Sequence, residues 1–147
     1  MIVVLFLHLI GASIWVGGHL YLLIRVMPPI LKTGDVKAFL AFEQSYEPLG
    51  MTALAIQVVT GLYMVHRYLP DWSMLIDGRA GVLGHLVLAK LFWLLLTLIT
   101  ALHARFFVVK KLINGSHTPN TLTIMYVHVI LICLWSLAFV ATGLAFG

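Results

Sequence analysis

Four long runs of apolar residues, separated by short polar connections, make up most of this chain. An α-helix needs about 20 apolar residues to cross about 30 Å of hydrocarbon. Runs of this length predict membrane-spanning helices at about residues 2–27, 48–69, 82–109 and 121–146. Short connections make successive helices antiparallel. The pattern therefore predicts an all-α integral membrane protein, with residues 1–147 forming one domain, a four-helix transmembrane bundle.

Proline, glycine and charged residues mark the connections between these helices. Pro28-Pro29 is expected to end the first helix. The charged stretch 31–47 that follows is expected to hold a short surface helix from Asp35 onward. Pro70-Asp71 and Asn114-Gly115 begin the other two connections.

Composition indicates that the lipid bilayer is the main solvent and partner of the chain. Hydrophobic residues make up 62% of the sequence and charged residues 10%, whereas about half of a soluble domain is apolar. The net charge of +4 does not indicate nucleic-acid binding, because no basic stripe or aromatic stacking platform accompanies it.

The basic residues instead predict the orientation of the bundle. Loops that stay in the cytoplasm keep an excess of Lys and Arg. Only Arg67 and Arg79 flank the second connection, while six basic residues flank the first and third. These six are Arg25, Lys32, Lys37, Arg105, Lys110 and Lys111. We therefore expect both termini in the periplasm and the protein in the inner membrane of a bacterium.

Seven histidines are unusual in so apolar a chain, and six lie within or at the edge of the expected spans. His8 and His19 are 11 positions apart, which returns to nearly the same helix face, with Trp15 between them. His85 and His103 are 18 positions apart, or five full turns, and also share a face.

The expected depth of the histidines divides them between the two halves of the bilayer. His8, His66 and His85 fall in the periplasmic half, whereas His19, His103 and His128 fall in the cytoplasmic half. Two such groups resemble the arrangement in dihaem membrane cytochromes, where imidazoles from facing helices are the axial ligands of haem b. All six are therefore candidate metal ligands, for one or two haems per chain.

The spacing leaves the pairing of these ligands open. Along the helix axis, His8 and His19 are about 16 Å apart, but His85 and His103 are about 27 Å apart. Either the helices tilt strongly, or other pairs form, such as His8 with His66 and His103 with His128. Small residues are expected to open space for the porphyrin. They are Gly11, Ala12, Gly17, Gly18, Gly61, Gly81 and Gly84.

Charged residues near the histidines are further candidates for the site. Lys90 lies about eight residues inside the third span, and such a charge usually faces the bundle interior. It is expected to pair with a haem propionate or to relay a proton as a catalytic group. Arg25 and Arg105 either extend to the headgroups or bind the propionates.

Several segments carry a family resemblance over most of the first three helices. They are Leu7-His8-Leu9-Ile10, Trp15, Gly17-Gly18, Leu20-Tyr21-Leu22, Phe39 to Glu43, Gly61-Leu62-Tyr63, Ala89-Lys90-Leu91 and His103. Together they resemble the HemJ-type protoporphyrinogen oxidases and the related CopD copper-resistance membrane domain. The HemJ resemblance implies a haem b protein that acts on a tetrapyrrole, with functional positions matching His8, Trp15 and Lys90.

Three functions remain open on the sequence alone. The first is a haem b electron-transfer protein, a membrane oxidoreductase that uses quinone or a redox partner protein, or that moves electrons across the bilayer between two haems. The second is CopD-like copper transport or resistance, although Cys133 is alone and the methionines form no close pair. The third is a structural subunit of a larger complex. A homo-oligomer is compatible with each of them.

Overall fold

The computed structural model describes residues 1–69 and 71–146, and the regular elements in these ranges are all helical. In chain order they are α1 (Ile2–Tyr21), the π-helix η1 (Leu22–Val26), α2 (Met27–Thr33), α3 (Val36–Tyr68), α4 (Ser73–Ile76), α5 (Gly81–His103), the π-helix η2 (Ala104–Val109), α6 (Lys110–Ile113) and α7 (Thr121–Leu144). They join into four long helices, each long and apolar enough to cross a membrane. The predicted all-α architecture with four such helices is confirmed.

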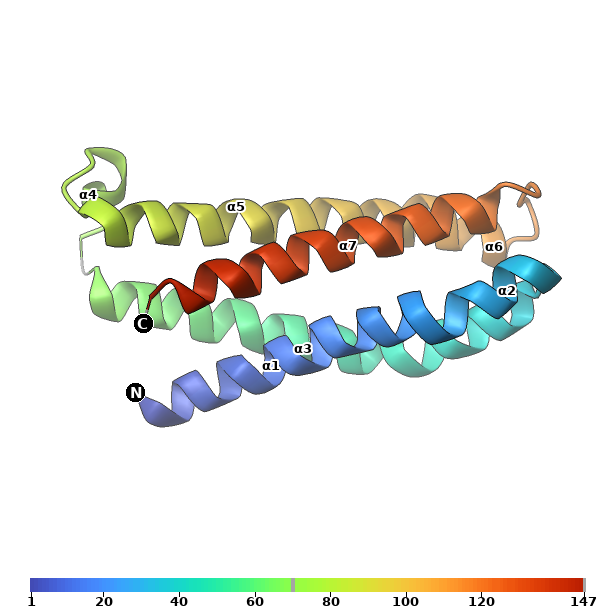
Figure 1. Cartoon of the computed structure of the whole chain (residues 1–147), viewed down its shortest axis with the longest axis horizontal. Coiled ribbons are helices and arrows are strands. Elements are labelled where there is room, and N and C mark those ends of the chain that lie inside the picture. Colours follow the sequence, from blue (N-terminus) through green and yellow to red (C-terminus); the bar gives the residue numbers. More distant parts are fainter. Residues whose placement is uncertain (70, 147) are drawn as a thin grey trace.

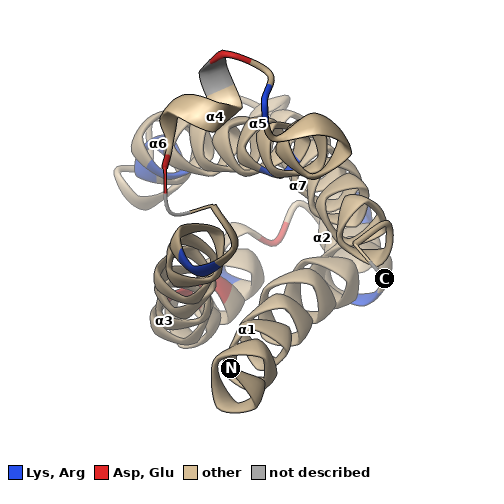
Figure 2. Ribbon diagram, turned by 90° about the vertical axis from the view of Figure 1, so that its left-hand side faces the viewer, with Lys and Arg blue, Asp and Glu red and all other residues tan. Residues whose placement is uncertain are grey.

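The four long helices form two hairpins that pack against each other. α1 lies along α3, and α5 lies along α7 (Figure 1). Both termini and α4 lie at one end of the bundle, which we call the terminal end, and α2 and α6 lie at the other, the loop end. Figure 2 looks along the bundle from the terminal end and shows the two hairpins as separate layers.

The first three helices are longer than the sequence predicted, whereas the fourth ends at Leu144, two residues earlier than predicted. The first continues to Thr33, the second begins at Val36, and the third runs from Gly81 to Ile113. Helices of 32 or 33 residues are about 50 Å long, well beyond the about 30 Å of a hydrocarbon core. The separate surface helix expected from Asp35 is therefore wrong, because that segment is the first part of α3. The side chain of Asp35 caps it by accepting the Ala38 N–H at 3.0 Å.

The expected helix end at Pro28-Pro29 is also wrong, and the π-helix η1 explains why. A proline inside an α-helix lacks an N–H donor, and its ring collides with the carbonyl four residues earlier. Here Met27 donates its N–H to the Leu22 carbonyl, five residues back, so the turn before the prolines is widened. The prolines then occupy the first turn of α2, where a missing N–H costs little.

The buried interior differs between the two halves of the bundle. At the loop end it is an apolar cluster that includes Met27, Phe39, Val108, Met125 and Val129. A smaller apolar cluster of Trp15, Leu54 and Ile132 follows near the middle. Toward the terminal end the buried side chains are largely polar. The polar ones are His8, Gln57, Thr60, Thr97 and Ser136, and the apolar Leu69 and Val87 are buried there as well.

Candidate functional site

The structure brings His103 of α5 and His128 of α7 into direct contact. His103 Nδ1 lies 2.8 Å from His128 Nε2, and the two rings are nearly parallel, 4° apart. This is one of the pairs that the sequence left open. His128 lies seven residues after the start of α7, which places the pair about 10 Å along that helix.

Hydrogen bonding fixes which nitrogen of each ring carries the proton. The Ile124 carbonyl can only accept, so His128 Nδ1, 2.8 Å away, donates to it. A neutral His128 then presents a lone pair at Nε2, and His103 Nδ1 donates to that lone pair. His103 Nε2 is left with its own lone pair. Phe107 stacks on the His103 ring with a centroid distance of 4.9 Å.

His8 is buried in the contact between α1 and α3, and both of its nitrogens are bonded. The Thr60 hydroxyl donates to the Ile56 carbonyl, so His8 Nδ1 is the donor to Thr60 Oγ1 at 2.9 Å. His8 Nε2 then accepts from the Gln57 amide at 3.0 Å. This set of bonds satisfies a neutral imidazole completely, and a metal could bind it only by displacing Gln57 or Thr60.

His19 is also buried, but it is held by its own helix. Its Nδ1 donates to the Trp15 carbonyl at 2.8 Å, and its ring lies against the Trp15 indole, with centroids 4.4 Å apart. Tyr46 of α3 covers its other side, edge to face at 5.6 Å. Within residues 1–69 and 71–146, no three His, Cys, Asp or Glu side chains gather as a metal site. Neither predicted group of three histidines is therefore assembled.

His66 and His85 lie at the surface, each close to the terminal end of its helix. His85 borders a small pocket between α4 and the start of α5. The expected pairing of His8 with His66 is not formed, because His8 bonds to Gln57 and Thr60 instead.

Lys90 reaches the terminal end of α7. Side chains on a helix lean toward its N-terminus, and the Lys90 ammonium lies 4.5 Å from the Phe139 ring and 5.4 Å from the Phe146 ring. Gly143 provides the space, because a Cβ there would come within 3.1 Å of Nζ. In the described part of the chain no carboxylate pairs with Lys90, and its charge is stabilised by the two rings and the end of α7.

Arg105 joins the two hairpins at the loop end. Its guanidinium lies 3.0 Å from Glu43 and 2.8 Å from Glu47, both on α3. The second carboxylate oxygen of Glu43 is buried without a hydrogen-bond partner among the described residues. Arg105 is therefore engaged by two glutamates rather than open to a propionate, whereas Arg25 in η1 is exposed.

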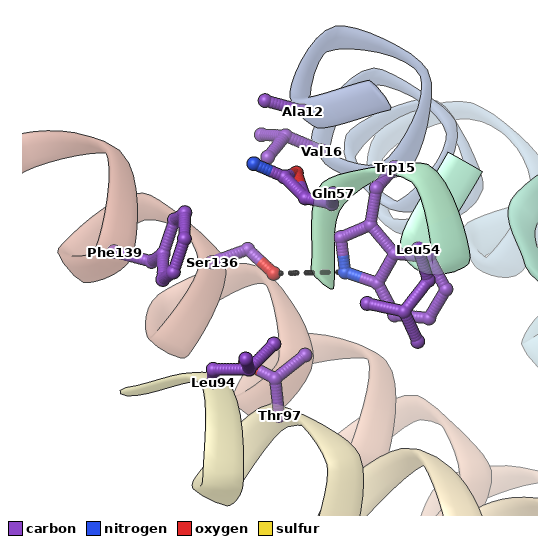
Figure 3. Close-up of a pocket in the computed structure, with 9 residues that line it drawn as sticks. All are labelled: Ala12, Trp15, Val16, Leu54, Gln57, Leu94, Thr97, Ser136 and Phe139. Atoms are coloured by element: carbon purple, nitrogen blue, oxygen red, sulfur yellow. Dashed lines mark hydrogen bonds between the residues drawn. The ribbon is translucent and has the colours of Figure 1, made fainter. Parts of the chain in front are cut away.

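A cleft between the hairpins is the main feature that the sequence did not predict. Trp15 Nε1 donates to Ser136 Oγ at 3.2 Å across it (Figure 3). The cleft is lined by Ala12, Trp15, Val16, Leu54, Gln57, Leu94, Thr97, Ser136 and Phe139. Gln57, an amide inside an apolar span, is the sequence signal that would have pointed to it.

The described packing does not fit a porphyrin between the hairpins. The cleft has a cavity volume of about 20 Å³, room for about one water molecule. Gly17 and Gly81 have open space around them, but other glycines expected to open space are filled: the Tyr46 ring lies against Gly18, and the His8 ring lies against Gly61. At Gly11 an added Cβ would lie 2.8 Å from the Ala53 carbonyl of α3.

Comparison with known proteins gives no relative, because no family model, curated protein or solved structure matches the chain.

Proposed function

We propose that the chain is a multi-pass protein of a bacterial inner membrane that handles copper, with the ion bound between His103 and His128. The four long helices and the many exposed large hydrophobic side chains support insertion into a membrane. The excess of Lys and Arg near the loop end supports an orientation with that end in the cytoplasm and both termini outside.

The observation that carries the proposal is the pair of imidazole nitrogens that face each other at 2.8 Å. An ion between them needs each nitrogen at about 2.0 Å, so the two must separate by roughly 1 Å. The proton of His103 Nδ1 then moves to Nε2, which leaves both facing nitrogens as ligands. The bond from His128 Nδ1 to the Ile124 carbonyl is the orienting contact that metal-bound imidazoles usually have.

Copper is the ion that best matches these ligands. For nitrogen ligands, affinity among the first-row divalent ions is highest for copper, and sulfur ligands favour its reduced form. Met27, Met125 and Cys133 all belong to the apolar cluster at the loop end, in the same half of the bundle as the pair. The resemblance to the CopD copper-resistance domain points to the same ion.

The test is copper(I) binding by the detergent-purified protein under anaerobic conditions, in competition with a chromophoric chelator. We expect one ion bound through the pair and an affinity at least tenfold lower in His103→Ala and in His128→Ala. His117→Ala, in the exposed connection before α7, is the matched control and should bind like the parent.

Unchanged affinity in both pair variants would refute the site. A dithionite-reduced minus oxidised spectrum of the same preparation tests the haem alternative. A sharp α band that is lost in His103→Ala or His128→Ala would show that the pair binds haem b instead of copper.

A further inference from the structure

Most of the buried polar side chains lie toward the terminal end of the bundle, although His19 and Thr121 are buried in the other half. His8, Gln57, Thr60, Thr97 and Ser136 are buried between the middle and the terminal end. The interior of the loop end, by contrast, is the large apolar cluster. A protein in lipid keeps polar side chains inside where they bond to one another or line water.

The bonds among these side chains do not use all of their polar atoms. Ser136 accepts the Trp15 N–H, but its own hydroxyl proton has no acceptor among the described residues. The Gln57 amide group donates to His8, and its oxygen has no donor there. The Thr97 hydroxyl donates to the Trp93 carbonyl and can still accept. All three side chains line the cleft (Figure 3).

We infer that the cleft between the hairpins is a hydrated vestibule, which begins at the terminal end and stops at the cluster of Trp15, Leu54 and Ile132. A water in the cleft that accepts from Ser136 and donates to Gln57 and Thr97 would fill the three open positions. The cleft, with a volume of about 20 Å³, has room for that water.

Water suits this lining better than a lipid chain does. A lipid chain in the same space would leave the Gln57 oxygen and the Ser136 hydroxyl without partners. Lys90 and His8 both approach Phe139, which borders the cleft on the side of the terminal end.

The experiment is cysteine labelling in the Cys133→Ser background, which removes the single native thiol. Thr97→Cys and Ala12→Cys place thiols in the cleft, and Leu95→Cys is the matched control. Leu95 is two residues from Thr97 on the same helix, about 3 Å in depth, but it faces outward with 54% exposure. A charged, membrane-impermeant methanethiosulfonate is added to one side or the other of oriented vesicles. It reacts with the thiolate form of cysteine, which exists only where water reaches the side chain.

We expect both cleft thiols to react at least tenfold faster than Leu95→Cys, and only from the side that holds the termini. Reaction of both at the control rate, or from the other side, would overturn the vestibule. The two cleft positions lie on different hairpins, so a packing defect in one variant does not decide the outcome. No copper is present, and the result is therefore independent of the metal site.

Discussion

The contact between Gly18 and Tyr46 gives a prediction whose magnitude follows from the packing. A Cβ added at Gly18 would overlap the Tyr46 ring. That ring cannot turn away freely, because its hydroxyl donates to the Ile14 and Trp15 carbonyls at 3.1 and 3.2 Å. Gly17, the preceding residue on α1, has nothing within 4 Å of its added Cβ. The two glycines are therefore matched in sequence and opposite in surroundings.

The free energy of unfolding should separate the two alanine variants. Forcing a side chain into a packed contact costs about 1–3 kcal/mol. Loss of the Tyr46 hydrogen bond adds about 1 kcal/mol, and the gain in helix propensity of alanine over glycine returns about 1 kcal/mol. Gly18→Ala should thus lower the free energy of unfolding by about 2 kcal/mol, which corresponds to a fall in Tm of about 4–8 °C. Gly17→Ala should keep or raise the Tm.

The assay is thermal unfolding in detergent, followed by circular dichroism. The double variant Gly18→Ala/Tyr46→Ala tests the cause. If the overlap with the Tyr46 ring is responsible, Gly18→Ala should lower the free energy of unfolding much less in the Tyr46→Ala background than in the parent protein. Equal Tm values for Gly17→Ala and Gly18→Ala, or full additivity in the double variant, would refute the reasoning.

Two further predictions concern charged and polar contacts between helices. Arg105→Gln should lower the free energy of unfolding by about 2 kcal/mol, because it leaves a largely buried Glu43 carboxylate without its cation. The double variant Glu43→Gln/Arg105→Gln should recover part of this loss. Additive losses in thermal unfolding would contradict that coupling. His8→Ala should lower the free energy of unfolding by about 3 kcal/mol, because it opens a cavity and leaves Thr60 with one hydrogen-bond partner fewer. His66→Ala, at the surface, is the control and should change this free energy by no more than about 0.5 kcal/mol.

The sequence alone determined the number of long helices and their order. This follows because an apolar run long enough to cross a bilayer is a local property, which can be counted without knowing any contact. The same local counting placed His103 and His128 at one level in the bundle, and in the structure their rings are in direct contact. It also ended the first helix too early, because the π-turn that accommodates Pro28 is not visible in a hydropathy pattern.

Only the tertiary structure decided which polar groups meet. A helical repeat fixes the face of His8 but not its partner, and the rotation and offset of α1 against α3 bring Gln57 and Thr60 to it rather than His66. The space at Gly18 and Gly61 could be read from the sequence as room for a cofactor, yet side chains of the protein itself occupy it. Distances between helices depend on how surfaces interlock, and this packing involves residues far apart in the chain.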